Sequence, residues 1–146
     1  MQQYIEFFSS NPMLSLLWVG LFVAIIMSYV KQKTAGYQIV TPAQTTNMVN
    51  RENGVVVDIR SRDEYRRGHI AGAHHILPSQ IKEQNFAELE NHKSDPIIVV
   101  CKTGQTAQDS ANELHKAGFV NVSVLKDGLI SWNEANLPLI RSKGKK

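Results

Sequence analysis

The single cysteine of the chain stands where a catalytic nucleophile is expected. Cys101 directly follows the aliphatic run Ile97–Val100, which predicts a buried strand, and it precedes a polar loop and a helix. Reactive groups in parallel sheets tend to lie beyond the carboxyl ends of the strands. We therefore interpret Cys101 as reactive. The alternative is a buried structural cysteine that behaves as a small hydrophobic residue.

The residues after Cys101 are suited to hold a negative charge. They join a strand to a helix N-terminus, so several backbone N–H groups can converge on one point. A thiolate is an anion of this kind, and a helix N-terminus together with Lys102 favours it. The loop therefore predicts a cysteine thiolate as the nucleophile. Its residues are Cys101, Lys102, Thr103, Gly104, Gln105 and Thr106.

Strands and helices alternate around this loop. Expected strands are 39–40, 55–59, 74–77, 97–100 and 120–124, and expected helices are 42–50, 61–67, 78–90, 106–117 and 129–135. Capping boxes at residues 41–44 and 61–64 mark two of the helix starts. Because crossover connections join parallel strands, the alternation predicts an α/β fold, a mostly parallel central sheet with helices on both faces.

The segment Met13–Val30 carries no charge and predicts one transmembrane helix. At about 1.5 Å per residue such a helix nearly crosses a hydrocarbon core of roughly 30 Å. A buried core helix is the alternative, but a domain this small would struggle to surround a helix that is apolar on every face. A cleaved signal peptide is disfavoured, because no basic residue precedes the apolar run and no small-residue cleavage site follows it.

Charges flanking the apolar segment predict its orientation. Lys31 and Lys33 follow it directly, so the positive-inside rule places the domain in the cytoplasm and the N-terminus outside, in a single-pass protein of the inner (plasma) membrane. The expected boundaries are an extramembrane segment 1–12, a transmembrane helix 13–30, a linker 31–36, a domain 37–139 and a basic disordered tail 140–146. Most of the net charge of +3 lies in that tail, and we expect a lipid bilayer but no nucleic acid as a partner.

Three motifs, in chain order, resemble those of the rhodanese-like (sulfurtransferase) family. The first comprises Val57–Arg60, Glu64-Tyr65 and Gly68–Ala73. The second is Cys101–Gly104 with Thr106. The third comprises Gly118-Phe119 with Val122, Lys126–Gly128 and Trp132. The resemblance covers roughly residues 38–138.

The resemblance implies a rhodanese-like fold and a sulfur-transfer reaction. Cys101 would take a sulfane sulfur from a small donor such as thiosulfate, hold it as a persulfide and pass it to a thiol or cyanide acceptor in a two-step cycle. Backbone amides of residues 102–106 would hold the terminal sulfur, with the Lys102 ammonium and the Thr103 and Thr106 hydroxyls as further donors. No metal or organic cofactor is implied.

The charged residues in and near the loop bear on which sulfur donor the site can bind. Many active members of the family carry an Arg within or just after the loop, whereas this chain has Gln105-Thr106-Ala107 and Lys102 is the loop's one cation. Two supporting residues are expected outside the loop, Asp58 and Arg60. Arg60 is, with Arg66 and Arg67, a candidate to supply charge, but a surface ion pair with Glu64 is the favoured interpretation. Asp58 is either a buried, hydrogen-bonded carboxylate that supports a neighbouring loop, which we favour, or a partner for a local Arg.

Two other functions compete with sulfur transfer. A phosphatase or arsenate reductase would need an Arg six positions after the cysteine, where this chain has Ala107, so that class is disfavoured. A weakly active or inactive docking module for membrane or cytoplasmic proteins is the stronger alternative. The scarcity of loop cations favours docking, and the presence of Cys101 favours an enzyme.

Overall fold

The computed structural model describes residues 1–142, without the side chain of Gln32. The chain divides into two compact units, residues 1–35 and the remainder. The first unit contains α1 (Gln2–Ser10) and α2 (Pro12–Lys33). Within α2, the stretch Pro12–Lys31 is long and apolar enough to cross a membrane, and none of it is buried. Of the predicted disordered tail 140–146, residues 143–146 lie outside the described part. The prediction is wrong for Ile140, because it forms an antiparallel bridge with His69 through hydrogen bonds of 2.9 Å and 2.8 Å.

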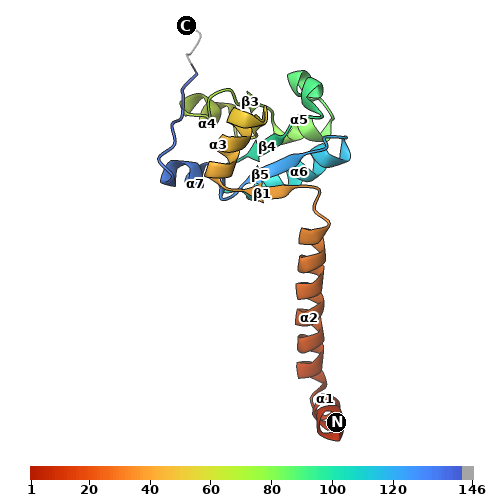
Figure 1. The fold of residues 1–146 in the computed structure, drawn as a ribbon. Coiled ribbons are helices and arrows are strands. Elements are labelled where there is room, and N and C mark those ends of the chain that lie inside the picture. Colours follow the sequence, from red (N-terminus) through yellow and green to blue (C-terminus); the bar gives the residue numbers. More distant parts are fainter. Residues whose placement is uncertain (143–146) are drawn as a thin grey trace. The chain divides into compact units, whose positions relative to one another are not determined.

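The second unit is built on a five-stranded sheet in the order β1-β5-β4-β2-β3, in which every neighbouring pair is parallel (Figure 1). This confirms the predicted α/β class. The strands are β1 (Gln38–Val40), β2 (Val55–Asp58), β3 (His74–His75), β4 (Ile97–Val100) and β5 (Val122–Leu125). All four residues of β4 are buried, as expected for a central strand that is covered on both faces.

Helices cover both faces of the sheet, again as predicted. One face packs against α5 (Pro78–Lys82), the 3-10 helix η1 (Ala87–His92) and α6 (Gln105–Lys116). The other face packs against α3 (Pro42–Arg51), α4 (Arg62–Arg67) and α7 (Gly128–Glu134), and includes the buried Trp132. Side chains alternate between the two cores along β4, so that Val99 belongs to the first core and Val100 to the second.

Both predicted capping boxes are present. The amide of Gln44 donates to the Thr41 hydroxyl at 3.2 Å, and the Gln44 side chain accepts from the Thr41 amide at 2.9 Å. Ser61 and Glu64 form the same reciprocal pair at the start of α4. Each box satisfies amides that the first helical turn would otherwise leave without partners.

The structure differs from the prediction of a continuous helix over 78–90. α5 ends at Lys82, and Gln84 takes a positive φ of 57°. The chain then turns, with the Asn85 amide bonded to the Gln80 carbonyl oxygen at 2.8 Å. This turn brings Phe86 into the core, where its ring meets Phe119 edge-on at a centroid distance of 5.2 Å. Burial of an aromatic side chain has outweighed local helix propensity.

Candidate active site

Cys101 lies at the carboxyl end of the central strand β4 and is 5% exposed. Its Sγ accepts a hydrogen bond from the amide of Gly104 at 2.9 Å. Within residues 1–142, this is the one backbone amide that bonds to the sulfur. Gly104 is buried, whereas the side chains of the other four loop residues, Lys102, Thr103, Gln105 and Thr106, are exposed.

Gly104 is the N-cap of α6 and has a φ of +91°, in the left-handed region that favours glycine. A Cβ at this position would lie 3.1 Å from the Asp127 amide nitrogen. No side chain caps the start of α6 within the described structure. The first amides of a helix carry partial positive charge, so this end of α6 is free to hold an anion beside the sulfur.

The start of α7 fixes the other side of the loop, which the sequence analysis did not foresee. The Leu129 amide donates to the Cys101 carbonyl oxygen at 2.9 Å, and the Ile130 amide donates to that of Lys102 at 3.4 Å. The Gly128 backbone packs against the carbonyl groups of Cys101 and Lys102, and a Cβ at this position would collide with the Cys101 carbonyl oxygen. With its carbonyl groups held by α7, the loop keeps its amides on the opposite side.

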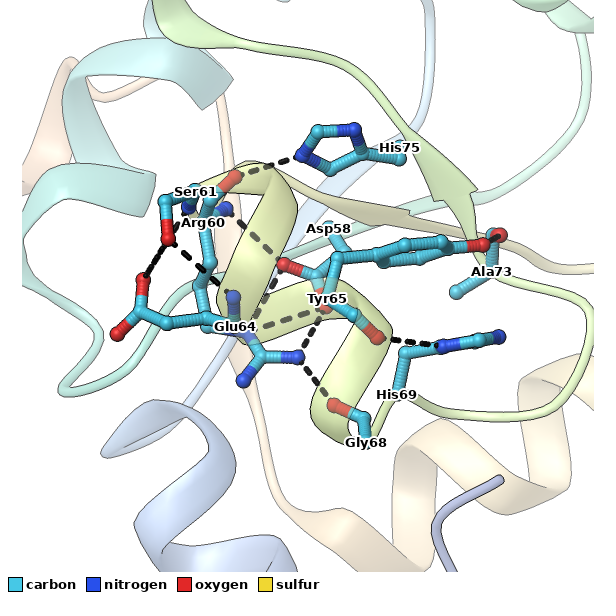
Figure 2. Close-up of polar contacts among 9 residues, drawn as sticks. All are labelled: Asp58, Arg60, Ser61, Glu64, Tyr65, Gly68, His69, Ala73 and His75. Carbon is cyan, nitrogen blue, oxygen red and sulfur yellow. Dashed lines mark hydrogen bonds and ion pairs between the residues drawn. The ribbon is translucent and has the colours of Figure 1, made fainter. Parts of the chain in front are cut away.

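Asp58 ends the neighbouring strand and holds Arg60. Asp58 is 1% exposed. Its Oδ1 accepts from the Arg60 amide and Nε, both at 3.0 Å, and its Oδ2 accepts from Nη2 at 2.7 Å. Arg60 Nη2 also donates to the Gly68 carbonyl oxygen at 2.6 Å (Figure 2). The expected ion pair between Arg60 and Glu64 is therefore wrong, because Arg60 pairs with Asp58 and Glu64 serves the α4 capping box.

The turn after β2 lies beside the cysteine loop. Asp58 and Val100 are register partners in β2 and β4, and the Ile59 amide donates to the Val100 carbonyl oxygen at 3.0 Å. The segments that follow β2 and β4 therefore leave the sheet side by side. The first leads to Ser61 and α4, and the second leads to Cys101 and α6.

The Tyr65 side chain of α4 stacks with two histidine rings (Figure 2). The Tyr65 ring lies between His69, at a centroid distance of 3.9 Å, and His75, at 4.8 Å. The Tyr65 hydroxyl donates to the Ala73 carbonyl oxygen at 2.6 Å. Burial raises the pKa of Tyr65, and the charge of Asp58 raises it further. The ring nitrogens of both histidines meet backbone carbonyls, which fits packing roles.

A family comparison identifies this arrangement. The family model for the rhodanese-like domain matches residues 41–135 of the chain. The chain belongs to the rhodanese-like family. The match includes the Asp58 and Arg60 pair, the cysteine loop and α7, and it excludes the N-terminal unit.

Relatives of this rhodanese-like protein fall into two groups. The uncharacterized protein YibN of Escherichia coli is 46% identical over 98% of this chain and 100% of its own length. Thiosulfate sulfurtransferase GlpE of Pseudoalteromonas translucida is 33% identical over 64% of this chain and 86% of its own length. The first group therefore shares the N-terminal unit, whereas the second matches only about the length of the domain.

Solved structures support the fold. A rhodanese-related protein from Thermoplasma volcanium superposes with a TM-score of 0.63 at 22% identity, covering 73% of this chain and all of its own. Together these comparisons support a domain of the sulfurtransferase family, whose members act on sulfur donors and acceptors.

Proposed function

We propose that this rhodanese-like protein is a membrane-anchored sulfurtransferase that carries a sulfane sulfur on Cys101. The hydrogen bond from the Gly104 amide to Sγ carries the proposal. A donor aimed at the sulfur stabilises negative charge there, and the uncapped start of α6 adds to that stabilisation. The thiolate is the form of cysteine that attacks.

The reaction proceeds in two substitution steps at sulfur. The Cys101 thiolate attacks the sulfane sulfur of a donor such as thiosulfate, a new S–S bond forms, and the donor's S–S bond breaks with sulfite leaving as a dianion. A thiolate or cyanide acceptor then attacks the outer sulfur of the persulfide, and the Cys101 thiolate leaves with the bonding electron pair. Each step conserves charge and needs neither oxidant nor reductant.

Loop residues receive their roles from this chemistry. An S–S bond of about 2.05 Å places the outer sulfur beyond Sγ, toward the amides and hydroxyl groups of the exposed loop residues. We assign the amides of Lys102, Thr103, Gln105 and Thr106 to the outer sulfur and the Gly104 amide to Sγ. Asp58 and Arg60 support the site indirectly by bracing the turn beside it.

We further propose that α2 spans the inner membrane and that the domain faces the cytoplasm, with residues 37–139 as the domain and 31–36 as its linker. Support comes from the apolar stretch Pro12–Lys31 and from Lys31 and Lys33 in the last turn of α2. The acceptor would then be met at the cytoplasmic membrane surface.

Mass measurement of the intact protein tests the sulfur-transfer proposal. The full chain in detergent micelles is incubated with thiosulfate, and the mass is expected to rise by about 32 Da, one sulfur atom, before acceptor is added. Cyanide should remove the added mass and yield thiocyanate. The Cys101→Ser variant should gain no mass.

Failure of the native chain to acquire sulfur from either thiosulfate or an organic persulfide would contradict the proposal. It would favour the alternative of a docking module, in which the loop is retained without turnover.

A further inference from the structure

Charged groups near the loop bear on which sulfur donors can reach Cys101. Arg60 contributes little net charge there, because Asp58 holds its guanidinium through both carboxylate oxygens. The Arg60 side chain is 11% exposed. Lys102 is thus the cation that a donor meets in the loop itself.

A fixed carboxylate lies at the start of α4, on the segment that leaves the neighbouring strand β2. The Ser61 hydroxyl and amide donate to Glu64 Oε2 at 2.9 Å and 3.2 Å, so the side chain is held in place at the start of α4. The Ile59 amide is bonded to the Val100 carbonyl oxygen, so the segment leading to this start and the segment leading to Lys102 leave the sheet side by side. Hydrogen bonds from Ser61 lower the pKa of Glu64, and the charges of Arg60 and Lys102 lower it further. The adjacent placement of the two segments and this effect of Lys102 on Glu64 together couple the two charges.

We propose that Glu64 is a specificity-determining residue that offsets the charge of Lys102 and so disfavours doubly charged donors relative to singly charged ones. The inference rests on the proposed sulfur transfer and names the preferred donor class: a sulfane sulfur carried by a group with a single negative charge or none. A fixed negative charge repels a dianion twice as strongly as a monoanion at the same distance.

Two donors with the same reactive sulfur and different charge test this proposal. Thiosulfate is a dianion that releases sulfite, and methanethiosulfonate is a monoanion that releases methanesulfinate, with the same S–S bond broken and the same persulfide formed on Cys101. The rate constant for adding sulfur to the full chain in micelles is measured with each donor at low ionic strength. Glu64→Gln keeps an oxygen that can accept both Ser61 hydrogen bonds and removes the charge alone.

Glu64→Gln is expected to raise the thiosulfate rate constant about fivefold and the methanethiosulfonate rate constant about twofold. The difference should vanish near about 1 M salt, where screening shortens the range of the charge to about 3 Å. Glu113→Gln is the matched control. It removes one charge from the far end of α6, about 12 Å along the helix from Gln105, and should change the ratio of the two rate constants by less than about 20%.

The possible failures can be told apart. Equal changes for both donors, or no change, would overturn the role of Glu64 while leaving sulfur transfer intact. No sulfur added to the native chain by either donor would overturn the proposed function itself, and this inference with it. Lys102→Gln provides an independent check, because it should lower the ratio of thiosulfate to methanethiosulfonate rate constants, and an unchanged ratio there would also contradict the inference.

Discussion

Two loops leave adjacent strands of the same sheet and lead into helices, but they differ in how the start of the following helix is capped. After β2, the turn to α4 is closed by its own side chains: Asp58 holds Arg60, and Ser61 and Glu64 cap the helix. After β4, the turn to α6 has no side-chain cap, and a glycine in the left-handed region begins the helix.

This difference separates a structural loop from one that can receive a ligand. At the start of α4 the Glu64 amide donates to the Ser61 hydroxyl, whereas at the start of α6 the Gly104 amide donates to the sulfur of Cys101. The β2 loop stabilises its neighbour through the Ile59 to Val100 hydrogen bond. One loop therefore supplies rigidity, and the other leaves the start of α6 without a side-chain cap in the described structure.

Asp58→Ala should give the largest effect, because it breaks the closed loop. Arg60 would remain largely buried without its carboxylate, and breaking a buried ion pair from one side costs about 3–5 kcal/mol. Urea unfolding of the full chain in micelles, followed by circular dichroism, measures this change in the free energy of unfolding.

The exposed Asp109→Ala on α6 is the control and should stay within about 0.5 kcal/mol of the native value. A similar small loss for Asp58→Ala would mean that the ion pair does not brace the β2 loop.

Gly104→Ala should have an intermediate effect on stability and a direct effect on the open loop. Its φ of +91° and the 3.1 Å approach of a Cβ to the Asp127 amide both oppose a side chain, at a cost of about 1–3 kcal/mol. Any shift of residue 104 would also weaken the amide's bond to Sγ. We expect iodoacetamide alkylation of Cys101 at neutral pH to slow by about tenfold.

Gly72→Ala is the control that separates the loss of stability caused by backbone strain from the effect on the Cys101 sulfur. Gly72 also has a positive φ, +77°, but a Cβ there would meet no atom within 4 Å. This variant should lose stability without changing the alkylation of Cys101. Equal alkylation rates in both variants would show that Gly104 does not tune the sulfur.

Local patterns were enough to predict much of this architecture. The capping boxes, the buried run of β4 and the place of Cys101 at its end each depend on residues within one short segment, and the structure has all three. The site roles of the loop residues remain predictions, because they concern bound sulfur.

Other features depend on segments that only the fold brings together. The spacing of Arg60 and Glu64 suggested a helical pair, but Arg60 precedes the N-cap Ser61 and so lies outside α4, where it pairs with Asp58. Gly128 lies 27 residues after Cys101, and β5 must pair with β4 before α7 can reach the loop. In the sequence Gly128 is only part of the third motif, and nothing near it indicates its contact with Cys101.

The smallest expected effect concerns pH and the closed loop. Ser61 hydrogen bonds lower the pKa of Glu64 below its ordinary value of 4.5, so its ionised form stabilises the folded state. That contribution is fully present above the unfolded pKa and is lost as the pH falls through the lower, folded pKa.

Glu64→Gln removes the titrating group. Between about pH 6 and pH 3, the native chain should therefore lose slightly more stability than the variant, as measured by urea unfolding at each pH. Parallel curves for the two proteins would mean that the capping carboxylate does not contribute through its charge, and that the cap of the β2 loop acts through its hydrogen bonds alone.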